Sequence, residues 1–199
     1  MAAQHIPRLT AEKYLEIERE ADFKSEFFGG EMYAMSGGTL PHALIAVNFS
    51  AELRQLLKGR GCSVMGSDLR VRGIEGGLYT YADVVVVCGP PKFVDGRGDT
   101  IVNPVLIVEV LSKSTEAHDR GLKFAQYRLI ESLREYVLVS QTEPRVESFL
   151  RQPDGEWRFT EFLGLDSSCS LQSVDVTIPL AEIYAMIPAG TFRLPDIFR

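Results

Sequence analysis

The sequence contains little cysteine: three residues in 199, Cys62, Cys88 and Cys169, and none of them lies at a zinc-finger or redox spacing. Such a sparse and odd set favours reduced thiols over a disulfide framework. Long hydrophobic runs are also missing, since no apolar stretch reaches the roughly 18 residues that a membrane span needs. The charged N-terminal segment lacks the apolar centre of a signal peptide. We therefore expect a cytoplasmic protein that does not enter the membrane.

An excess of positive charge is absent as well. The formal net charge is −6, which argues against electrostatic binding of nucleic acid by the whole protein surface. Local basic clusters remain, and most of them are explained as solvated charges on helix faces. They are Arg54, Lys58, Arg60, Arg70, Arg72, Lys113, Arg120, Lys123, Arg128 and Arg134.

The composition is that of an ordinary globular domain, with 45% hydrophobic and 24% charged residues. We find no internal repeat, low-complexity segment or domain boundary. We therefore expect one domain over residues 1–199, with a core over about 24–141 and a C-terminal β extension and tail over 142–199.

Strand and helix patterns alternate along the chain and predict an α/β fold with a mixed central sheet flanked by helices. Val84–Val87 and Val105–Val108 are the continuous aliphatic runs typical of strands covered on both faces, so we expect them to be central and adjacent. The predicted helices cover 11–19, 39–59, 115–133 and 179–186. The predicted strands cover 24–28, 31–35, 62–72, 79–88, 101–112, 135–140, 145–151, 156–163 and 174–178. The segments around 145–163 form an antiparallel C-terminal extension of the sheet.

Two of the apolar strands each contain one carboxylate, Asp83 or Glu109. A desolvated carboxylate costs several kcal/mol unless it is paired, hydrogen-bonded or bound to a metal. If the strands are neighbours, the two acids converge on an oxygen-rich site of the kind that Mg²⁺ prefers, and the Val110 carbonyl adds a third oxygen. Two alternatives remain open: Asp83 pairs with Arg70 or Arg72, or Glu109 forms a buried salt bridge.

The helix after the Glu109 strand presents Asp119, Lys123 and Tyr127 on one face, because they stand four residues apart. An ammonium near a bound metal can orient water and stabilise the charge that develops on a phosphate under attack. Metal, acids and lysine together suit the hydrolysis of a phosphodiester.

Three residues are secondary candidates for the site: Glu31, His42 and Tyr127. His42 falls on the inward face of its predicted helix, where a hydrogen-bonded core histidine is the common alternative. Glu31 lies at a hairpin end, where a solvated side chain is the alternative, and Asp68 is a similar but weaker candidate. Tyr127 is expected to pack with its hydroxyl near the site.

At these residues the chain resembles the PD-(D/E)XK restriction-endonuclease-like superfamily, and within it the Uma-two family of endonuclease-like proteins. The resemblance spans about residues 26–140. It rests on Tyr33-Ala34-Met35-Ser36, His42, Ala82-Asp83-Val84-Val85-Val86, Glu109-Val110-Leu111-Ser112, Ser114-Thr115, Asp119, Lys123, Tyr127 and Glu135-Tyr136.

The resemblance implies a restriction-endonuclease-like sheet, metal binding by Asp83 and Glu109, and hydrolysis of DNA with Mg²⁺ or Mn²⁺. Ala82 stands in place of the superfamily's proline, and Leu111 in place of its catalytic lysine. Lys123 is then expected to act as a migrated lysine. Lys113 is the rival, although strand alternation points it away from the face of Glu109.

Cutting both strands of a duplex usually needs two active sites, so we expect a homodimer. The alternative function is a catalytically degenerate family member that binds nucleic acid or a protein without cleaving.

Overall fold

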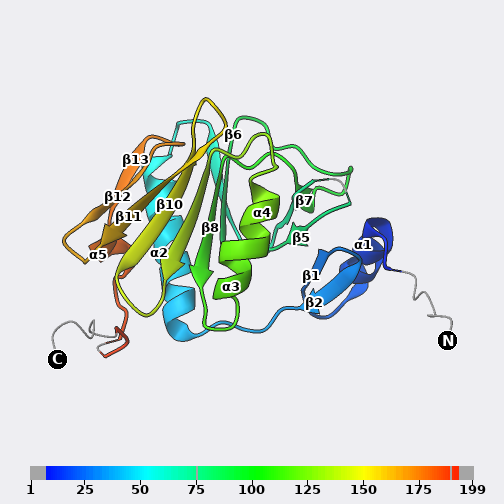
Figure 1. Ribbon diagram of the computed structural model, residues 1–199, viewed down its shortest axis with the longest axis horizontal. Coiled ribbons are helices and arrows are strands. Elements are labelled where there is room, and N and C mark those ends of the chain that lie inside the picture. The colour runs from blue at the N-terminus through cyan, green and yellow to red at the C-terminus, as the bar shows by residue number, and fades with distance from the viewer. Residues whose placement is uncertain (1–7, 75, 189, 193–199) are drawn as a thin grey trace.

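The computed structural model describes residues 8–74, 76–188 and 190–192. Within these residues, six strands form a mixed central sheet in the order β11-β10-β9-β8-β6-β3 (Figure 1). Strands β8 and β9 are parallel, and the other neighbours are antiparallel. The strands are β3 (Cys62–Gly66), β6 (Val84–Cys88), β8 (Leu106–Leu111), β9 (Glu135–Ser140), β10 (Arg145–Arg151) and β11 (Trp157–Leu163). The α/β class, the mixed sheet and its antiparallel extension are as predicted.

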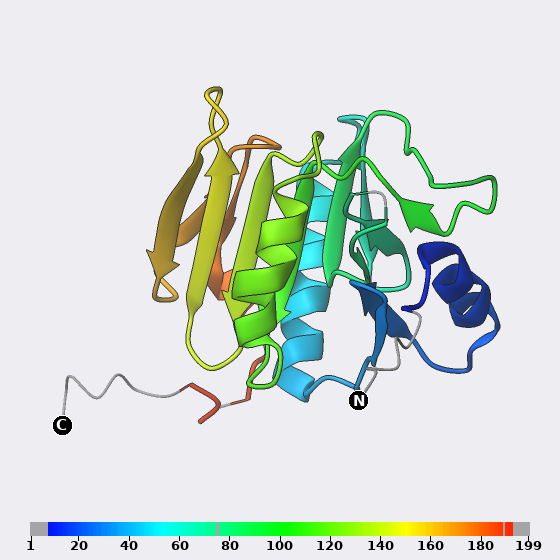
Figure 2. The same cartoon turned by 45° about the vertical axis from the view of Figure 1, so that its right-hand side comes forward.

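Helices cover both faces of this sheet. Helix α2 (Leu40–Leu56) lies on one face, and α3 (Glu116–His118), the π turn η1 (Asp119–Lys123) and α4 (Phe124–Tyr127) lie on the other (Figure 2). Because side chains alternate along a strand, β6 and β8 supply both cores. Val84, Val86, Leu106, Val108 and Val110 belong to the core under α2, whereas Val85, Val87, Ile107 and Leu111 belong to the core under α4. The expected pairing of the two valine-rich strands is confirmed.

A second, smaller sheet has the order β2-β1-β5-β4-β7. Its strands are β1 (Ser25–Phe28), β2 (Glu31–Ala34), β4 (Arg70–Arg72), β5 (Tyr79–Thr80) and β7 (Thr100–Ile101). Helix α1 (Ala11–Glu20) packs on it through Tyr14 and Leu15, which contact Phe27 and Tyr79 in a small core of their own. The predicted Gly29-Gly30 turn joins β1 to β2, and both glycines have the positive φ that favours this residue.

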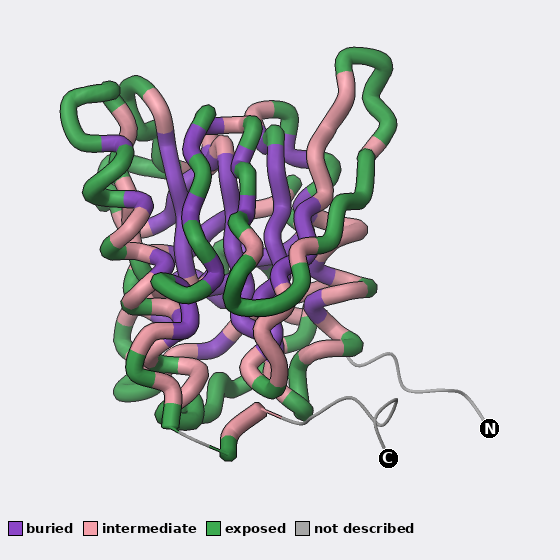
Figure 3. The backbone as a smooth tube through the Cα atoms, turned by 90° about the vertical axis from the view of Figure 1, so that its left-hand side faces the viewer, coloured by how far each residue is buried: buried purple, intermediate pink, exposed green. Residues whose placement is uncertain are grey.

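The C-terminal part closes the core under α2. Strands β12 (Ser168–Leu171) and β13 (Val176–Pro179) form a hairpin that is followed by α5 (Leu180–Ile183). Apolar residues of these elements are buried together with those of α2, and the middle strands of the central sheet, β6, β8 and β9, run through the most buried part of the molecule (Figure 3). None of the helices in the described residues is long and apolar enough to cross a membrane.

Three predicted strands are each divided between the two sheets. The segment 62–72 gives β3 and β4, 79–88 gives β5 and β6, and 101–112 gives β7 and β8. Each break contains polar or turn-forming residues, Ser67-Asp68, Asp83 or Asn103-Pro104, but apolar residues continue on both sides, which is why each segment is predicted as one strand. One of these breaks contains Asp83, which therefore lies at the junction of the sheets.

The predicted helix over 115–133 is shorter and less regular than expected. It starts at Glu116, widens into the π turn η1, and ends at Tyr127. The residues after Tyr127 form turns, although Ile130 and Leu133 still enter the core. A π turn inside a helix is often a functional site.

The structure corrects the expectation of reduced thiols, because Cys62 and Cys88 form a disulfide. The two residues are directly opposite each other in the β3–β6 ladder but are 26 apart in the sequence. Spacing rules for local cysteine motifs cannot detect such a pairing. Cys169 remains a free, buried thiol. The argument for a cytoplasmic location from reduced thiols therefore falls away.

The disulfide is expected to stabilise the fold by lowering the conformational entropy of the unfolded chain. For a closed loop of this length, the free energy of unfolding should fall by about 3.5 kcal/mol when the bond is reduced. Thermal unfolding with and without dithiothreitol measures the effect, with a Cys62→Ser/Cys88→Ser double variant as the control that should not respond to the reductant. Titration of the unfolded, non-reduced protein should find a single free thiol, and three free thiols would contradict the pairing.

Candidate active site

Asp83 and Glu109 come together because β6 and β8 are neighbours. In their antiparallel register Val84 is opposite Val108, so Asp83, just before β6, comes opposite Glu109, just after Val108. The Oδ2 atom of Asp83 accepts a hydrogen bond of 2.7 Å from the backbone N–H of Val110. This bond fixes Asp83 to the strand that contains Glu109.

His42 contacts Asp83 from the first turn of α2. Thr39 caps this helix, as predicted, by accepting from the His42 backbone N–H at 3.3 Å. The His42 Nε2 atom lies 3.4 Å from Asp83 Oδ2. The carboxylate of Asp83 raises the pKa of His42, although partial burial opposes the shift. The backbone of Val110 adds to the rise, so Asp83, His42 and Val110 form one contact group.

Glu109 is buried on the α4 side of the sheet and is hydrogen-bonded to that helix layer. Its Oε1 atom accepts from Lys123 Nζ at 3.2 Å and from Tyr127 Oη at 2.9 Å. Desolvation raises the pKa of Glu109 well above its usual value, and the positive charge of Lys123 offsets only part of this rise. The predicted face of Lys123 and Tyr127 is therefore the one that contacts Glu109.

Two further carboxylates surround the same ammonium. Lys123 Nζ lies 3.0 Å from Glu26 Oε1 and 3.2 Å from Asp119 Oδ1. Glu26 also accepts a hydrogen bond from the hydroxyl of Thr80. Burial alone would lower the pKa of Lys123, but the three carboxylates raise it well above its usual value. Lys123 therefore remains positively charged over the whole physiological pH range.

The site contains more negative than positive charge. Four acids, Glu26, Asp83, Glu109 and Asp119, face one ammonium and the imidazole of His42. Burial raises the pKa of Asp119 as well, and its Oδ1 atom is buried with no hydrogen-bond partner in the described residues. It lies within ion-pair distance of Lys123, but not in a direction that allows a hydrogen bond. Such a site favours an additional cation or proton.

The donor set fits a divalent cation. Its ligands are carboxylate oxygens, which Mg²⁺ and Mn²⁺ prefer. Within the part of the chain that the structure describes, no three His, Cys, Asp or Glu side chains form a ready-made metal cage. Mg²⁺ does not require one, because it keeps several waters and commonly uses one or two carboxylates together with phosphate oxygens of the substrate.

The remaining predicted candidates lie elsewhere. Glu31 is exposed and accepts a hydrogen bond of 2.7 Å from the Tyr33 hydroxyl, and Asp68 is exposed and paired with Lys24. Lys113 is exposed. Arg70, considered above as a partner of Asp83, instead binds Asp99, Thr100 and Tyr81.

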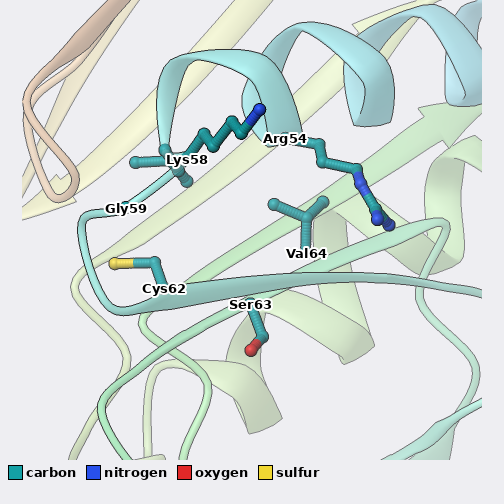
Figure 4. A pocket seen from close by; sticks show the side chains of 7 residues that line it. Arg54, Lys58, Gly59, Cys62, Ser63 and Val64 are labelled. Carbon is teal, nitrogen blue, oxygen red and sulfur yellow. The ribbon is translucent and has the colours of Figure 1, made fainter.

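A hollow of about 330 Å³ lies at the far end of α2 from His42 (Figure 4). Side chains of Arg54 and Lys58 extend over it from the end of the helix. Its lining consists of Arg54, Leu57, Lys58, Gly59, Cys62, Ser63 and Val64. None of the acids described above takes part in it, so the hollow is separate from the candidate active site.

Sequence reasoning missed Glu26 and gave Asp119 no role in the site. Asp119 had a usable signal, because it is four residues from Lys123 on the same helix face. Glu26 had none, since its position depends on the pairing of β1 with β5, which places it beside Thr80.

The fold is that of a restriction-endonuclease-like protein. The model of the Uma2 family, described as "Putative restriction endonuclease", matches residues 11–181. The chain belongs to the Uma2 family, which confirms the resemblance found in the sequence.

Two proteins are similar to this chain over most of its length. "Uncharacterized protein slr1290" from Synechocystis sp. (strain ATCC 27184 / PCC 6803 / Kazusa) is 36% identical over 181 residues, which cover 90% of this chain and 93% of that protein. "Uncharacterized protein sll1609" from the same strain is 38% identical over 156 residues, 78% of this chain and 88% of that protein.

A solved structure shares the fold. It is the crystal structure of "a putative nuclease belonging to DUF820" from Anabaena variabilis ATCC 29413, with a TM-score of 0.72 at 15% identity. The match covers 88% of this chain and 97% of that one. This likeness confirms the predicted restriction-endonuclease-like architecture.

The raised pKa of Glu109 predicts a pH-dependent stability. A carboxyl whose pKa is higher in the folded state stabilises the fold while it is protonated, below its unfolded pKa of about 4.3, and this contribution is lost as the pH rises through the folded pKa. Glu109→Gln should therefore be more stable than the wild type at pH 8, and the difference should shrink towards pH 4. A gain of 1 kcal/mol would raise Tm by about 2–4 °C.

Thermal melts from pH 4 to pH 8 measure this difference. Glu31→Gln is the control, because its carboxyl is exposed and the same substitution there should not change the pH profile. Parallel profiles for the wild type and Glu109→Gln would contradict the buried, proton-favouring environment.

Proposed function

We propose that this chain is a Mg²⁺- or Mn²⁺-dependent endonuclease that hydrolyses phosphodiester bonds of DNA. The observation that carries the proposal is the contact of Glu109 with Lys123 inside an apolar core, next to Asp83 and two more acids. A purely structural ion pair would not need an excess of buried negative charge, which is costly. The description of the Uma2 family supports the same activity.

Asp83 and Glu109 would hold the cation, with the Val110 carbonyl as a third oxygen. A divalent cation supplies Lewis-acid polarisation of the phosphate and activation of water as nucleophile. The hydrogen bond from Val110 N–H to Asp83 keeps that carboxylate next to β8, and the Tyr127 hydroxyl orients the Glu109 carboxylate. His42 next to Asp83 supports the orientation of the first acid.

Lys123 is proposed as the migrated catalytic lysine. Leu111, at the usual position of the lysine, is buried in the core under α4 and offers no charge. Lys123 reaches Glu109 from η1 instead, and its raised pKa keeps it protonated. It would therefore act as a fixed positive charge that stabilises the phosphate in the transition state, not as a proton acceptor. Glu26 and Asp119 hold the ammonium in place.

The DNA substrate, the homodimer and the cytoplasmic location stay predictions. The homodimer follows from the need for two active sites to cut both strands of a duplex.

Metal dependence is tested by titrating Mg²⁺ or Mn²⁺ while plasmid cleavage and Tm are followed. The wild type should gain thermal stability and cleave, whereas Asp83→Asn should lose the metal-induced shift and cleave at least about 100-fold more slowly. Asp68→Asn, an exposed acid outside the site, is the matched control. A wild type whose Tm does not respond to either metal would defeat the metal site. DNA binding without cleavage would favour the degenerate binding module.

The role of Lys123 is tested against the neighbouring lysine. Lys123→Ala should reduce cleavage by about 100-fold or more, and Lys113→Ala, at an exposed position, should cleave like the wild type. Because Lys123→Ala leaves buried acids unpaired, it should also destabilise the fold by about 3–5 kcal/mol. Lys123→Arg keeps the charge and the fold, and should be impaired in cleavage because its planar head group changes the geometry. An inactive Lys113→Ala with an active Lys123→Ala would reverse the assignment.

A further inference from the structure

The rim of the candidate active site contains two aromatic rings that the mechanism does not use. Tyr33 on β2 is directly opposite Glu26 on β1, so the two side chains lie on the same face of the hairpin. His118 of α3 approaches from the other side, with Nε2 at 4.0 Å from Glu26 Oε2. The Tyr33 and His118 ring centroids are 6.5 Å apart, with an angle of 48° between the planes. Two rings thus meet over the carboxylate that contacts Lys123.

Exposure increases along this set of residues from the lysine outwards. The side chain of Lys123 is 7% exposed and that of Glu26 is 12% exposed. The side chain of His118 is 34% exposed, and Tyr33 is 46% exposed. The two rings are therefore the most exposed members of this set and lie on the solvent side of Glu26 and the buried ammonium.

The Tyr33 ring is held in place although it is exposed. Its hydroxyl donates a hydrogen bond of 2.7 Å to Glu31, and its backbone belongs to the β1–β2 ladder. The carboxylate of Glu31 raises the pKa of Tyr33, so the hydroxyl stays protonated and keeps donating. A fixed ring loses little conformational freedom when a flat ligand stacks on it.

A nucleic-acid base is the flat group that accompanies a phosphodiester. When the phosphate of a nucleic acid occupies the site beside Lys123, the base of the adjoining nucleotide lies within reach of the rings at the rim. Tyrosine and histidine rings stack on bases without regard to sequence, because every base has a π face. A base in a duplex must first be unstacked and unpaired, at a cost of a few kcal/mol, whereas a base in a single strand is already accessible.

We propose that Tyr33 and His118 form a base-stacking subsite that makes unpaired nucleic-acid strands the preferred substrate. The inference rests on the proposed phosphodiester hydrolysis at the same site and adds the strandedness of the substrate. Glu31 acts as a positioning residue for the Tyr33 ring.

The test compares the affinity of the full-length Glu109→Gln protein, which is expected not to cleave, for a fluorescent single strand and for the same strand annealed to its complement. Single-strand binding should be the tighter, and adding Tyr33→Ala or His118→Ala should weaken it by about 5- to 150-fold, the equivalent of one base-stacking contact. Duplex binding should change much less. Tyr33→Phe keeps the ring and should retain most of the single-strand affinity.

Phe159→Ala is the matched control, because it removes a similarly exposed ring, 53%, from the distant edge strand β11. Equal affinity for the two substrates, an equal loss in Phe159→Ala, or no binding to either strand form would overturn the subsite. Cleavage by the wild type separates the two proposals. If single-strand binding depends on the two rings but the wild type does not cleave, the stacking subsite is supported and the nuclease proposal is wrong. If the wild type cleaves but binding does not depend on the rings, the nuclease proposal is supported and the subsite is wrong.

Discussion

The contact between Glu109 and Lys123 is the interaction on which the other features of the site depend. The Glu109 carboxylate is tolerated inside the most apolar strand because the Lys123 ammonium and the Tyr127 hydroxyl contact it from the helix layer that covers this face of the sheet. The helix that supplies them widens into a π turn whose first and last residues are Asp119 and Lys123. The smaller sheet then adds Glu26. The sheet and helix elements around the site thus each supply a group that contacts the buried pair or its neighbours, and the excess of acids has a cost in stability.

Local patterns allowed much of this arrangement to be predicted. The valine-rich runs identified β6 and β8 as neighbours, and from that pairing the approach of Asp83 to Glu109 followed. Helical spacing placed Lys123 and Tyr127 on one face, and the structure turns that face towards Glu109. In these cases the relevant information lies within a few residues, or in the composition of a whole strand, where periodicity is a reliable guide.

The features that were missed depend on pairing between distant segments. Glu26 reaches the site because β1 joins β5, and Cys62 meets Cys88 because β3 and β6 align in one register. Neither strand register can be predicted from the sequence spacing of the residues that it brings together. The division of three strands between two sheets had a local signal that was passed over, because polar or turn-forming residues stand in each break: Ser67-Asp68, Asp83 and Asn103-Pro104. The early end of the helix after Tyr127 was masked by Ile130 and Leu133, which are buried from turns.

The three breaks also have a mechanical consequence. In the described chain, residues 67–69, 81–83 and 102–105 each connect a strand of the small sheet to a strand of the large one. Three short covalent connections leave the sheets little freedom to separate, but a slight rotation of one against the other would bend all three at once. Asp83 lies within such a connection, whereas Glu109 lies inside a continuous strand. The hydrogen bond from Val110 N–H ties Asp83 to the large sheet, so a force on the β1–β2 hairpin reaches the site first through Glu26 of β1 and its contact with Lys123.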